Sequence, residues 1–170
     1  MENIITTSRL ILRELSNIDD INFYELNNDT DVMKFTGDQP FKSIEEARHF
    51  LESYSDYSSN GFGRWAVILK ETNEFIGWCG IKKNSNQEID LGFRFKAKFW
   101  NMGYATESSQ GVLKYAFNTL KLKYIIARTA TKNDPSIRVL TKLGFVFWKT
   151  EDYDNFGLCH FYKIYNEKYN

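Results

Sequence analysis

Several stretches of the chain alternate apolar and polar residues with a period of about two, which is typical of β-strands that bury one face. Other stretches repeat apolar residues every three or four positions, as amphipathic helices do. The alternation is clearest over residues 89–95, and with it the chain is read as seven strands, at residues 9–14, 64–69, 74–81, 88–95, 124–130, 145–150 and 159–165. The second pattern predicts helices at about residues 16–28, 43–57 and 135–143, and a further helix that contains Val112, Leu113, Ala116, Phe117 and Leu120.

The connections between these elements indicate how the strands are ordered. Polar, turn-like segments separate the strands at 64–69, 74–81 and 88–95, so these three are expected to form an antiparallel meander. The strand–helix–strand segment over 88–130 is expected to be a parallel, right-handed crossover. We therefore expect an α/β (α+β) fold in a single domain over residues 1–170, with a mixed, mostly antiparallel seven-stranded sheet. About four helices would cover both faces of that sheet.

The composition excludes several classes of function. The 22 basic and 22 acidic residues cancel, whereas a direct nucleic-acid partner usually requires a basic excess or stripe. No apolar run approaches the roughly 18 residues that suggest a membrane span, and the N-terminus lacks the pattern of a secretory signal. We therefore expect a cytoplasmic protein without a membrane partner. Cys79 and Cys159 are expected to be buried, reduced thiols. The cysteines and histidines lie scattered, so no metal site is expected.

The segment WNMGYATE at residues 100–107 lies between a predicted strand and a predicted helix. The first amides of a helix have no intrahelical partner, and the helix dipole adds positive charge there. Such a turn is a potential site for an anion such as phosphate. Small side chains at Gly103 and Ala105 would let a bulky ligand approach the backbone. An ordinary strand-to-helix turn has the same local pattern, so the segment alone leaves both interpretations open.

Five motifs in order resemble the GNAT superfamily of acyl-CoA-dependent N-acyltransferases. They are TSRLILR at residues 7–13, FIG at 75–77, LGF at 91–93, WNMGYATE at 100–107, and NDPS at 133–136 followed by KLGF at 142–145. The first is similar to the opening strand of the branch that includes ribosomal-protein N-terminal (alanine/serine) acetyltransferases. The resemblance covers nearly the whole chain. It implies a GNAT fold, with a V-shaped split between the fourth and fifth predicted strands, and often a homodimer.

The resemblance also implies that acetyl-CoA is the cosubstrate and that an amine is the acceptor. Backbone amides of the loop would bind the CoA pyrophosphate, and the backbone of the preceding strand would pair with the pantetheine arm as an added strand. Asn133 would contact that arm and Lys142 the phosphates, although an exposed helix charge is the alternative for Lys142. The loop and strand residues concerned are Met102, Gly103, Tyr104, Ala105 and Thr106, with Phe93, Arg94 and Phe95.

Two loop positions depart from the pattern of the branch. Asn101 stands where glycine is common, and Met102 stands where a basic residue is common. Because asparagine tolerates a positive φ better than most residues, the turn is expected to survive. Phosphate binding would then depend on backbone amides, with Lys96 and Lys98 as candidates for nearby charge.

The resemblance gives two side chains a catalytic role. Ser136 would lie near the sulfur and donate a proton to the leaving thiolate, although it could be a plain helix-turn serine. Asp90 would receive the amine proton, and it lies on the opposite strand face from Leu91 and Phe93. Its alternatives are an exposed strand residue or an ion pair. Asp134 is expected to cap the following helix, with Pro135 as its first residue.

The leading hypothesis is an acetyl-CoA-dependent N-acetyltransferase that acts directly on a protein N-terminal α-amine. An α-amine with a pKa near 8 is partly neutral at pH 7, whereas a lysine amine near 10.4 needs a stronger base. The alternatives are a small-molecule amine, such as a polyamine or antibiotic, and a non-catalytic acyl-CoA-binding domain. Phe35, Phe41 and Trp78 are expected to line the acceptor pocket, unless they belong to the core.

Overall fold

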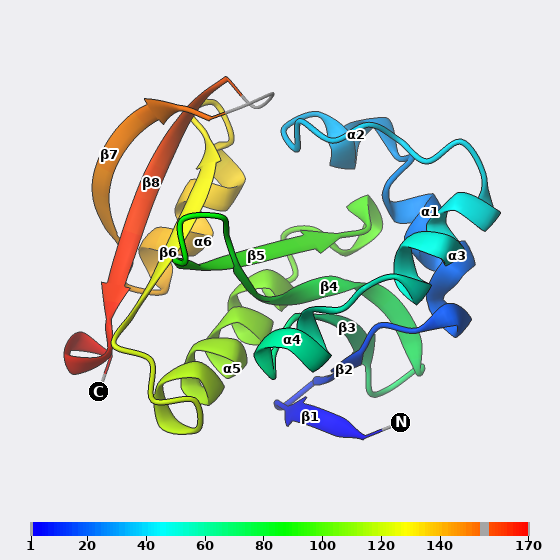
Figure 1. Ribbon diagram of the computed structural model, residues 1–170, viewed down its shortest axis with the longest axis horizontal. Coiled ribbons are helices and arrows are strands. Elements are labelled where there is room, and N and C mark those ends of the chain that lie inside the picture. The colour runs from blue at the N-terminus through cyan, green and yellow to red at the C-terminus, as the bar shows by residue number, and fades with distance from the viewer. Residues whose placement is uncertain (1, 154–156, 170) are drawn as a thin grey trace.

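The computed structural model describes residues 2–153 and 157–169. Its strands form one eight-stranded sheet in the order β1-β2-β3-β4-β5-β6-β8-β7 (Figure 1). The strands are β1 Asn3–Thr6, β2 Leu10–Glu14, β3 Arg64–Leu69, β4 Glu74–Lys83, β5 Ile89–Phe95, β6 Tyr124–Ala130, β7 Val146–Asp152 and β8 Leu158–Tyr165. Only the β5–β6 pair is parallel among the described strands. The predicted mixed, mostly antiparallel sheet is confirmed.

The sheet has one strand more than the sequence predicts. The additional strand, β1, pairs antiparallel with β2 and is four residues long. Ile5 is its one buried side chain, so the local pattern is too short to reveal a period of two. The turn that joins it to β2 is closed by the amide of Thr7, which donates to the carbonyl of Leu10 at 3.0 Å. Pairing with a neighbour, rather than local alternation, defines this strand.

The helices are shorter and more divided than the sequence predicts. The α-helices are α1 Asp20–Leu26, α2 Thr30–Met33, α3 Ile44–Glu52, α4 Asp56–Asn60, α5 Tyr104–Asn118 and α6 Asp134–Lys142, and the short 3-10 turns are η1 Asn17–Asp19, η2 Ala97–Phe99 and η4 Asn166–Lys168. Ser43 caps α3 as expected, because its side chain accepts from the Glu46 amide at 3.3 Å.

The predicted helix over 43–57 is wrong in its second half, where α3 ends and α4 begins separately. Two tyrosines in this region bind the backbone of the sheet and of the segment after β2. The amide of Arg64 donates to the Tyr54 hydroxyl at 2.9 Å, and the amide of Leu15 donates to the Tyr57 hydroxyl at 3.0 Å. These tertiary hydrogen bonds favour the break in the helix.

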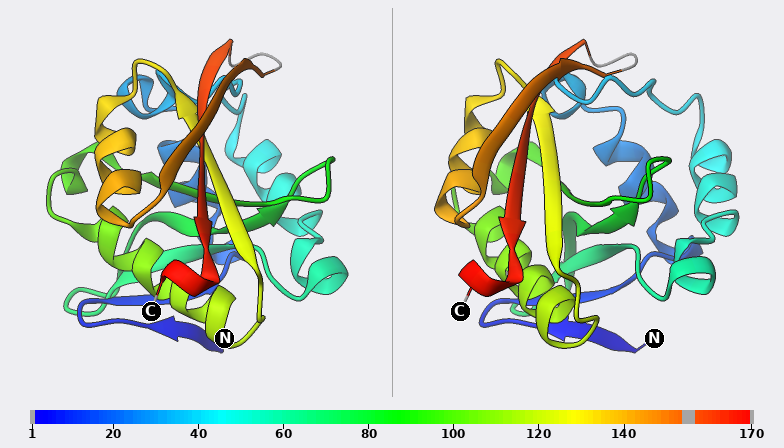
Figure 2. Two further views of the ribbon diagram at one scale, coloured as in Figure 1. Left: turned by 90° about the vertical axis from the view of Figure 1, so that its left-hand side faces the viewer. Right: turned by 60° about the vertical axis from the view of Figure 1, so that its left-hand side comes forward.

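Helices cover both faces of the sheet, as predicted. In the right-hand view of Figure 2, α5 and α6 lie on one side and α1 and α3 on the other. Alternate residues of β3 enter the two cores: Trp65 and Val67 pack on the α5 side, and Ala66 and Ile68 on the α1 side. Each large apolar side chain buried in this way contributes roughly 1.5–3 kcal/mol. Both predicted thiols are buried and free of disulfides.

The sheet splits between β5 and β6, as predicted. The two strands pair at a single position, Asp90 with Ile126. Beyond it, β5 stays paired with β4 as far as Phe95, and β6 stays paired with β8 as far as Ala130. Figure 1 shows β6 rising away from β5. Because each strand keeps its outer partner while the inner edges separate, the backbone groups along the inner edge of β5 face the fork without a strand partner.

Candidate active site

The loop after β5 delivers the chain to the start of α5 through two left-handed residues. Asn101 has a φ of 61° and Gly103 a φ of 82°, so the asparagine adopts the positive φ that the sequence predicts it tolerates. Within α5 the Glu107 amide donates to the Gly103 carbonyl at 3.0 Å. The amides of Tyr104, Ala105 and Thr106 precede this first helical bond, and therefore remain at the helix N-terminus for an anion.

A guanidinium group lies against this loop. The Arg9 Nη1 atom donates to the Met102 carbonyl at 3.0 Å, and its Nε atom donates to Glu107 Oε2 at 2.7 Å. The guanidinium carbon also lies 4.4 Å from the centroid of the Tyr104 ring. Burial opposes the ionisation of Glu107, but hydrogen bonds from Thr7 and Arg9 hold its pKa below the usual value.

The predicted candidates for charge near the loop are engaged elsewhere. Lys96 pairs with Glu25 at 3.1 Å, and Lys98 pairs with Glu74 at 2.5 Å. Arg9, rather than one of these two lysines, is therefore the basic side chain that contacts the loop. No local signal marked it, because it comes from the start of β2.

The last three residues of β5 border the fork, and the Phe95 carbonyl accepts a hydrogen bond from Trp100 Nε1 at 2.8 Å. On the other edge, Phe93, Arg94 and Phe95 pair with β4. The Arg94 side chain is used within the fold, since its Nη2 atom lies 2.5 Å from Asp38 Oδ2 and its Nη1 atom donates to Asn27. A ligand in the fork would therefore meet the main chain of these residues rather than the Arg94 charge.

Asp90 lies at the point where the fork closes. Its residue exposure is 9%, so the alternative of an exposed strand position is wrong. Its Oδ2 atom lies 3.7 Å from Arg128 Nη1, and its Oδ1 atom has no hydrogen-bond partner among the described residues. Burial raises the pKa of Asp90 to about 6, although the charges of Arg128 and Arg64 act in the opposite direction. At pH 7 this carboxylate is ionised, yet it binds a proton more tightly than a surface aspartate.

A cavity of about 170 Å³ lies beside this carboxylate. It is lined by Arg64, Lys82, Lys83, Asn84, Ser85, Asp90, Arg128 and Tyr153. The Arg128 guanidinium carbon lies 3.8 Å from the Tyr153 ring centroid. Apart from Asp90, none of these residues could be predicted from the sequence as part of the site. They come from separate strands and turns, which only the strand register brings together.

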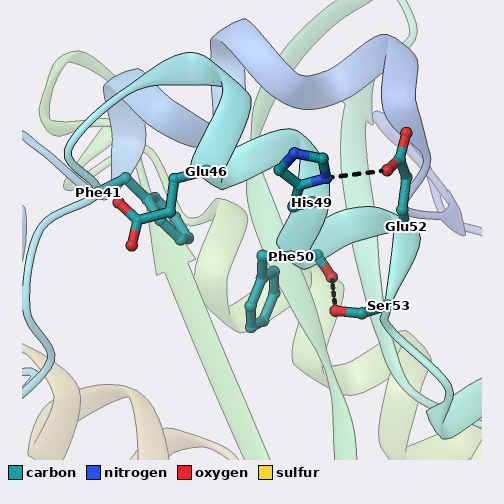
Figure 3. Close-up of a pocket in the computed structure, with 6 residues that line it drawn as sticks. All are labelled: Phe41, Glu46, His49, Phe50, Glu52 and Ser53. Carbon is teal, nitrogen blue, oxygen red and sulfur yellow. Dashed lines mark hydrogen bonds and ion pairs between the residues drawn. The ribbon is translucent and has the colours of Figure 1, made fainter.

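A larger hollow, of about 670 Å³, lies on α3 and the segment before it. Figure 3 shows its lining residues Phe41, Glu46, His49, Phe50, Glu52 and Ser53. It contains none of the predicted catalytic or cofactor-binding residues. Phe41, expected in the acceptor pocket, lines this hollow instead, and Trp78 belongs to the core on the α1 side. We therefore take the smaller cavity, beside the fork, as the candidate active site.

The second predicted cofactor motif lies at the start of α6, shortly after the open end of β6. Asn133, rather than the predicted Asp134, caps this helix: its Oδ1 atom accepts from the Ser136 amide at 3.3 Å. Pro135 is therefore the second helical residue, not the first. Asparagine and aspartate cap almost equally well, so sequence could not decide between them. The cap uses the carbonyl oxygen of Asn133 and leaves its amide nitrogen for a ligand.

The remaining predicted residues, Ser136 and Lys142, lie near opposite ends of α6. Ser136 is half-buried in the first turn of α6. Lys142 is exposed in the last turn, roughly 13 Å along the helix axis from Asn133. The two open ends of the fork thus carry the two predicted cofactor motifs. Within residues 2–153 and 157–169, no cluster of side chains could hold a metal ion, and no helix is long and apolar enough to cross a bilayer.

Known proteins share this architecture. Residues 9–146 match the family model for the acetyltransferase (GNAT) domain. The uncharacterised N-acetyltransferase p20 of Bacillus licheniformis is 32% identical over 142 residues, which cover 82% of this chain and 80% of that protein. A GNAT-family acetyltransferase from Bacillus anthracis superposes with a TM-score of 0.83 at 30% identity, covering 96% of this chain and 99% of that one.

Spermidine N-acetyltransferase from Vibrio cholerae, solved with CoA and spermine, superposes with a TM-score of 0.81 and covers 95% of this chain and 98% of that one. Its identity is 21%, so this likeness concerns the fold. The family model spans the segment from before β2 to the start of β7, and so includes the fork, the loop at the start of α5 and the whole of α6. The chain therefore belongs to the GNAT acetyltransferase family and is an N-acetyltransferase that uses acetyl-CoA.

Proposed function

We propose that this chain transfers the acetyl group of acetyl-CoA to the primary amine of a small molecule, by direct attack of the amine on the thioester in the fork. The observation that carries this proposal is the buried Asp90 carboxylate, which has an unbonded oxygen and lines a cavity of about 170 Å³. That volume is below the roughly 300–1,000 Å³ of drug-sized ligand pockets, so it suits a compact acceptor group. A GNAT-fold relative solved with spermine supports an amine of this class.

The proposed binding mode uses the main chain at the open end of the fork. The amides at the start of α5 hold the pyrophosphate, and the edge of β5 that borders the fork, from Phe93 to Phe95, pairs with the pantetheine arm. The amide nitrogen of Asn133 contacts the same arm, and Lys142 contacts the phosphates. Holding thioester and amine together in this way lowers the barrier without a covalent intermediate.

The proposed chemistry needs two proton transfers. The amine nitrogen attacks the carbonyl carbon, an amide bond forms, and the carbon–sulfur bond breaks. The proton lost by the amine passes to Asp90, directly or through water, and later to solvent. Ser136 donates a proton to the departing thiolate and recovers one from solvent. Because a thiol has a pKa near 8.5, the leaving thiolate needs no strong acid.

A protein N-terminal α-amine is the second candidate acceptor. One observation favours it: a base with a pKa of about 6 suits an amine whose own pKa is near 8 better than one near 10.4.

An acceptor panel separates these classes. Purified protein would be incubated with acetyl-CoA and, separately, with amino acids, polyamines, aminoglycosides and peptides that carry free N-termini. CoA release and the mass of each acceptor would be followed together. The proposal predicts an acetyl mass shift on small amines with matching CoA release. Acetylation of peptides alone would favour the second candidate, and silence across every class would contradict both.

A further inference from the structure

We infer that the acceptor carries a carboxylate beside its amine, and that Arg64 binds this carboxylate while the amine lies at Asp90. This inference rests on the proposed function, because it names the acceptor class for the same site. It makes Arg64 a residue that determines specificity.

The cavity beside Asp90 is lined by positive charge. Its described lining includes four basic residues, Arg64, Lys82, Lys83 and Arg128, and one acidic residue, Asp90. Arg64 is half-buried and the Arg128 side chain is 17% exposed, so water screens these guanidinium groups less than it screens surface charges. Such a lining repels an acceptor that carries several positive charges. It attracts an acceptor that carries a negatively charged group in the same molecule as its amine.

Arg64 differs from the other arginines on this face of the sheet. Arg94 pairs with Asp38 at 2.5 Å, and Arg128 faces Asp90 at 3.7 Å. The guanidinium of Arg64 lies 4.5 Å above the Trp78 ring, and within the described part of the chain it has neither an ion pair nor a hydrogen bond. Asp90 acts on Arg64 only at a distance, and a half-buried charge without a directly bound counter-ion is costly. A carboxylate from the acceptor would supply that counter-ion, and the planar guanidinium matches it in two hydrogen bonds.

A glycine in β5 lets the Trp78 ring pack closely beside Arg64. Gly92 lies on the same face of β5 as Asp90, two residues further along the strand. A Cβ atom there would stand 3.3 Å from the Trp78 ring and 4.0 Å from Arg64 Nε. The glycine therefore lets the Trp78 ring, with the Arg64 guanidinium above it, lie close against the β5 backbone. The cavity lining contains both the Arg64 guanidinium and the Asp90 carboxylate, which suits an acceptor with opposite charges at its two ends.

Matched acceptors test the inference. Leucine, leucinamide and 3-methylbutylamine share one side chain and one amine but differ in the carboxylate, and lysine differs from cadaverine in the same way. Phosphoethanolamine tests a phosphate in place of the carboxylate. Each acceptor would be assayed with acetyl-CoA and each of four enzymes: wild type, Arg64→Met, Arg64→Lys and Lys114→Met. The last is the control, because it removes an exposed charge from α5. The ratio of kcat/KM between two enzymes for one acceptor cancels differences in amine pKa.

We expect Arg64→Met to lower kcat/KM for the amino acids by about tenfold or more, through KM, as for a lost charged hydrogen bond. Arg64→Lys should recover part of this loss, and Lys114→Met should match wild type. At pH 8, well above the pKa of Asp90, the acceptors that lack an anionic group (leucinamide, 3-methylbutylamine and cadaverine) should change by less than about twofold. Thermal stabilisation by CoA shows whether each variant keeps its fold and cofactor site.

Several results would contradict this inference and still agree with the proposed function. They are acetylation of cadaverine or leucinamide in preference to the amino acids, preference for phosphoethanolamine, or an Arg64→Met variant that loses activity equally on every amine. Absence of transfer to any amine in the panel would instead contradict the proposed function itself.

Discussion

Arg128 places its Nη1 atom 3.7 Å from the Oδ2 atom of Asp90, at the position where β5 and β6 part. This separation is longer than that of a charge-assisted hydrogen bond, which is about 2.7–2.9 Å. The guanidinium therefore compensates only part of the cost of burying the carboxylate, and the pKa of Asp90 rises to about 6. Asp90 is thus ionised at neutral pH and still able to accept a proton.

The pH dependence of the reaction should report this pKa. Because Asp90 must be ionised to act as the base, kcat/KM should fall about tenfold per pH unit as the pH drops below 6. Asp90→Asn should lower kcat by about 10²–10⁴ and abolish this acidic limb. Initial rates from pH 5 to 9 with one acceptor measure both effects. An unchanged acidic limb in Asp90→Asn would assign the titration to another group.

The same residue should make stability depend on pH. Its pKa in the folded chain, about 6, is higher than its ordinary value of 3.8, so folding favours the protonated form. The stability that this contributes is fully present below pH 3.8 and is lost as the pH rises through 6. Relative to Asp90→Asn, wild type should lose up to about 3 kcal/mol of unfolding free energy between pH 4 and pH 8. Urea unfolding at both pH values measures this difference, and equal losses in both proteins would contradict it.

Two glycines with the same backbone conformation offer a matched test of the loop. Gly103 has a φ of 82° and Gly61 a φ of 75°. Alanine at either position is strained by on the order of 1 kcal/mol. Only Gly103 lies at the proposed pyrophosphate site, so Gly103→Ala should weaken CoA binding several-fold while Gly61→Ala leaves it unchanged. Calorimetric titration with CoA checks this. Equal affinities in the two variants would remove the loop from the cofactor site.

Asn133 combines a structural and a proposed binding role that substitution can separate. Asn133→Asp keeps the side-chain oxygen that caps α6, so thermal stability should stay close to wild type. It removes the amide that we propose contacts the pantetheine arm, so KM for acetyl-CoA should rise. Asn133→Ala should lose both, at a cost of about 1 kcal/mol in stability. If Asn133→Asp matched wild type in KM as well, the residue would be a helix cap alone.

The first strand of the fork could be predicted from sequence because it carries its own alternation. In β5, the polar residues Asp90 and Arg94 alternate with the apolar residues Leu91 and Phe93, and this period is visible in the chain. Helix boundaries were harder to predict. At the break between α3 and α4, the Tyr54 hydroxyl accepts from the Arg64 amide and the Tyr57 hydroxyl donates to the Arg64 carbonyl, and no local pattern reveals these bonds.

Likewise, only part of the candidate site could be predicted from the sequence. Asp90 could be found because it precedes a family motif in one strand. Arg64, Arg128 and Tyr153 could not, because register and turn geometry bring them to the cavity from different parts of the chain. Arg9 likewise reaches the loop before α5 from the first hairpin.

The most direct test of acetyl transfer in the fork compares wild type with Asp90→Asn on the acceptor panel, measuring CoA release and acetylated product in the same samples. We predict equal amounts of CoA and acetylated amine from wild type, and turnover lower by about 10²–10⁴ in Asp90→Asn, with CoA binding retained. Full turnover by Asp90→Asn, or CoA release without an acetylated amine, would contradict the account.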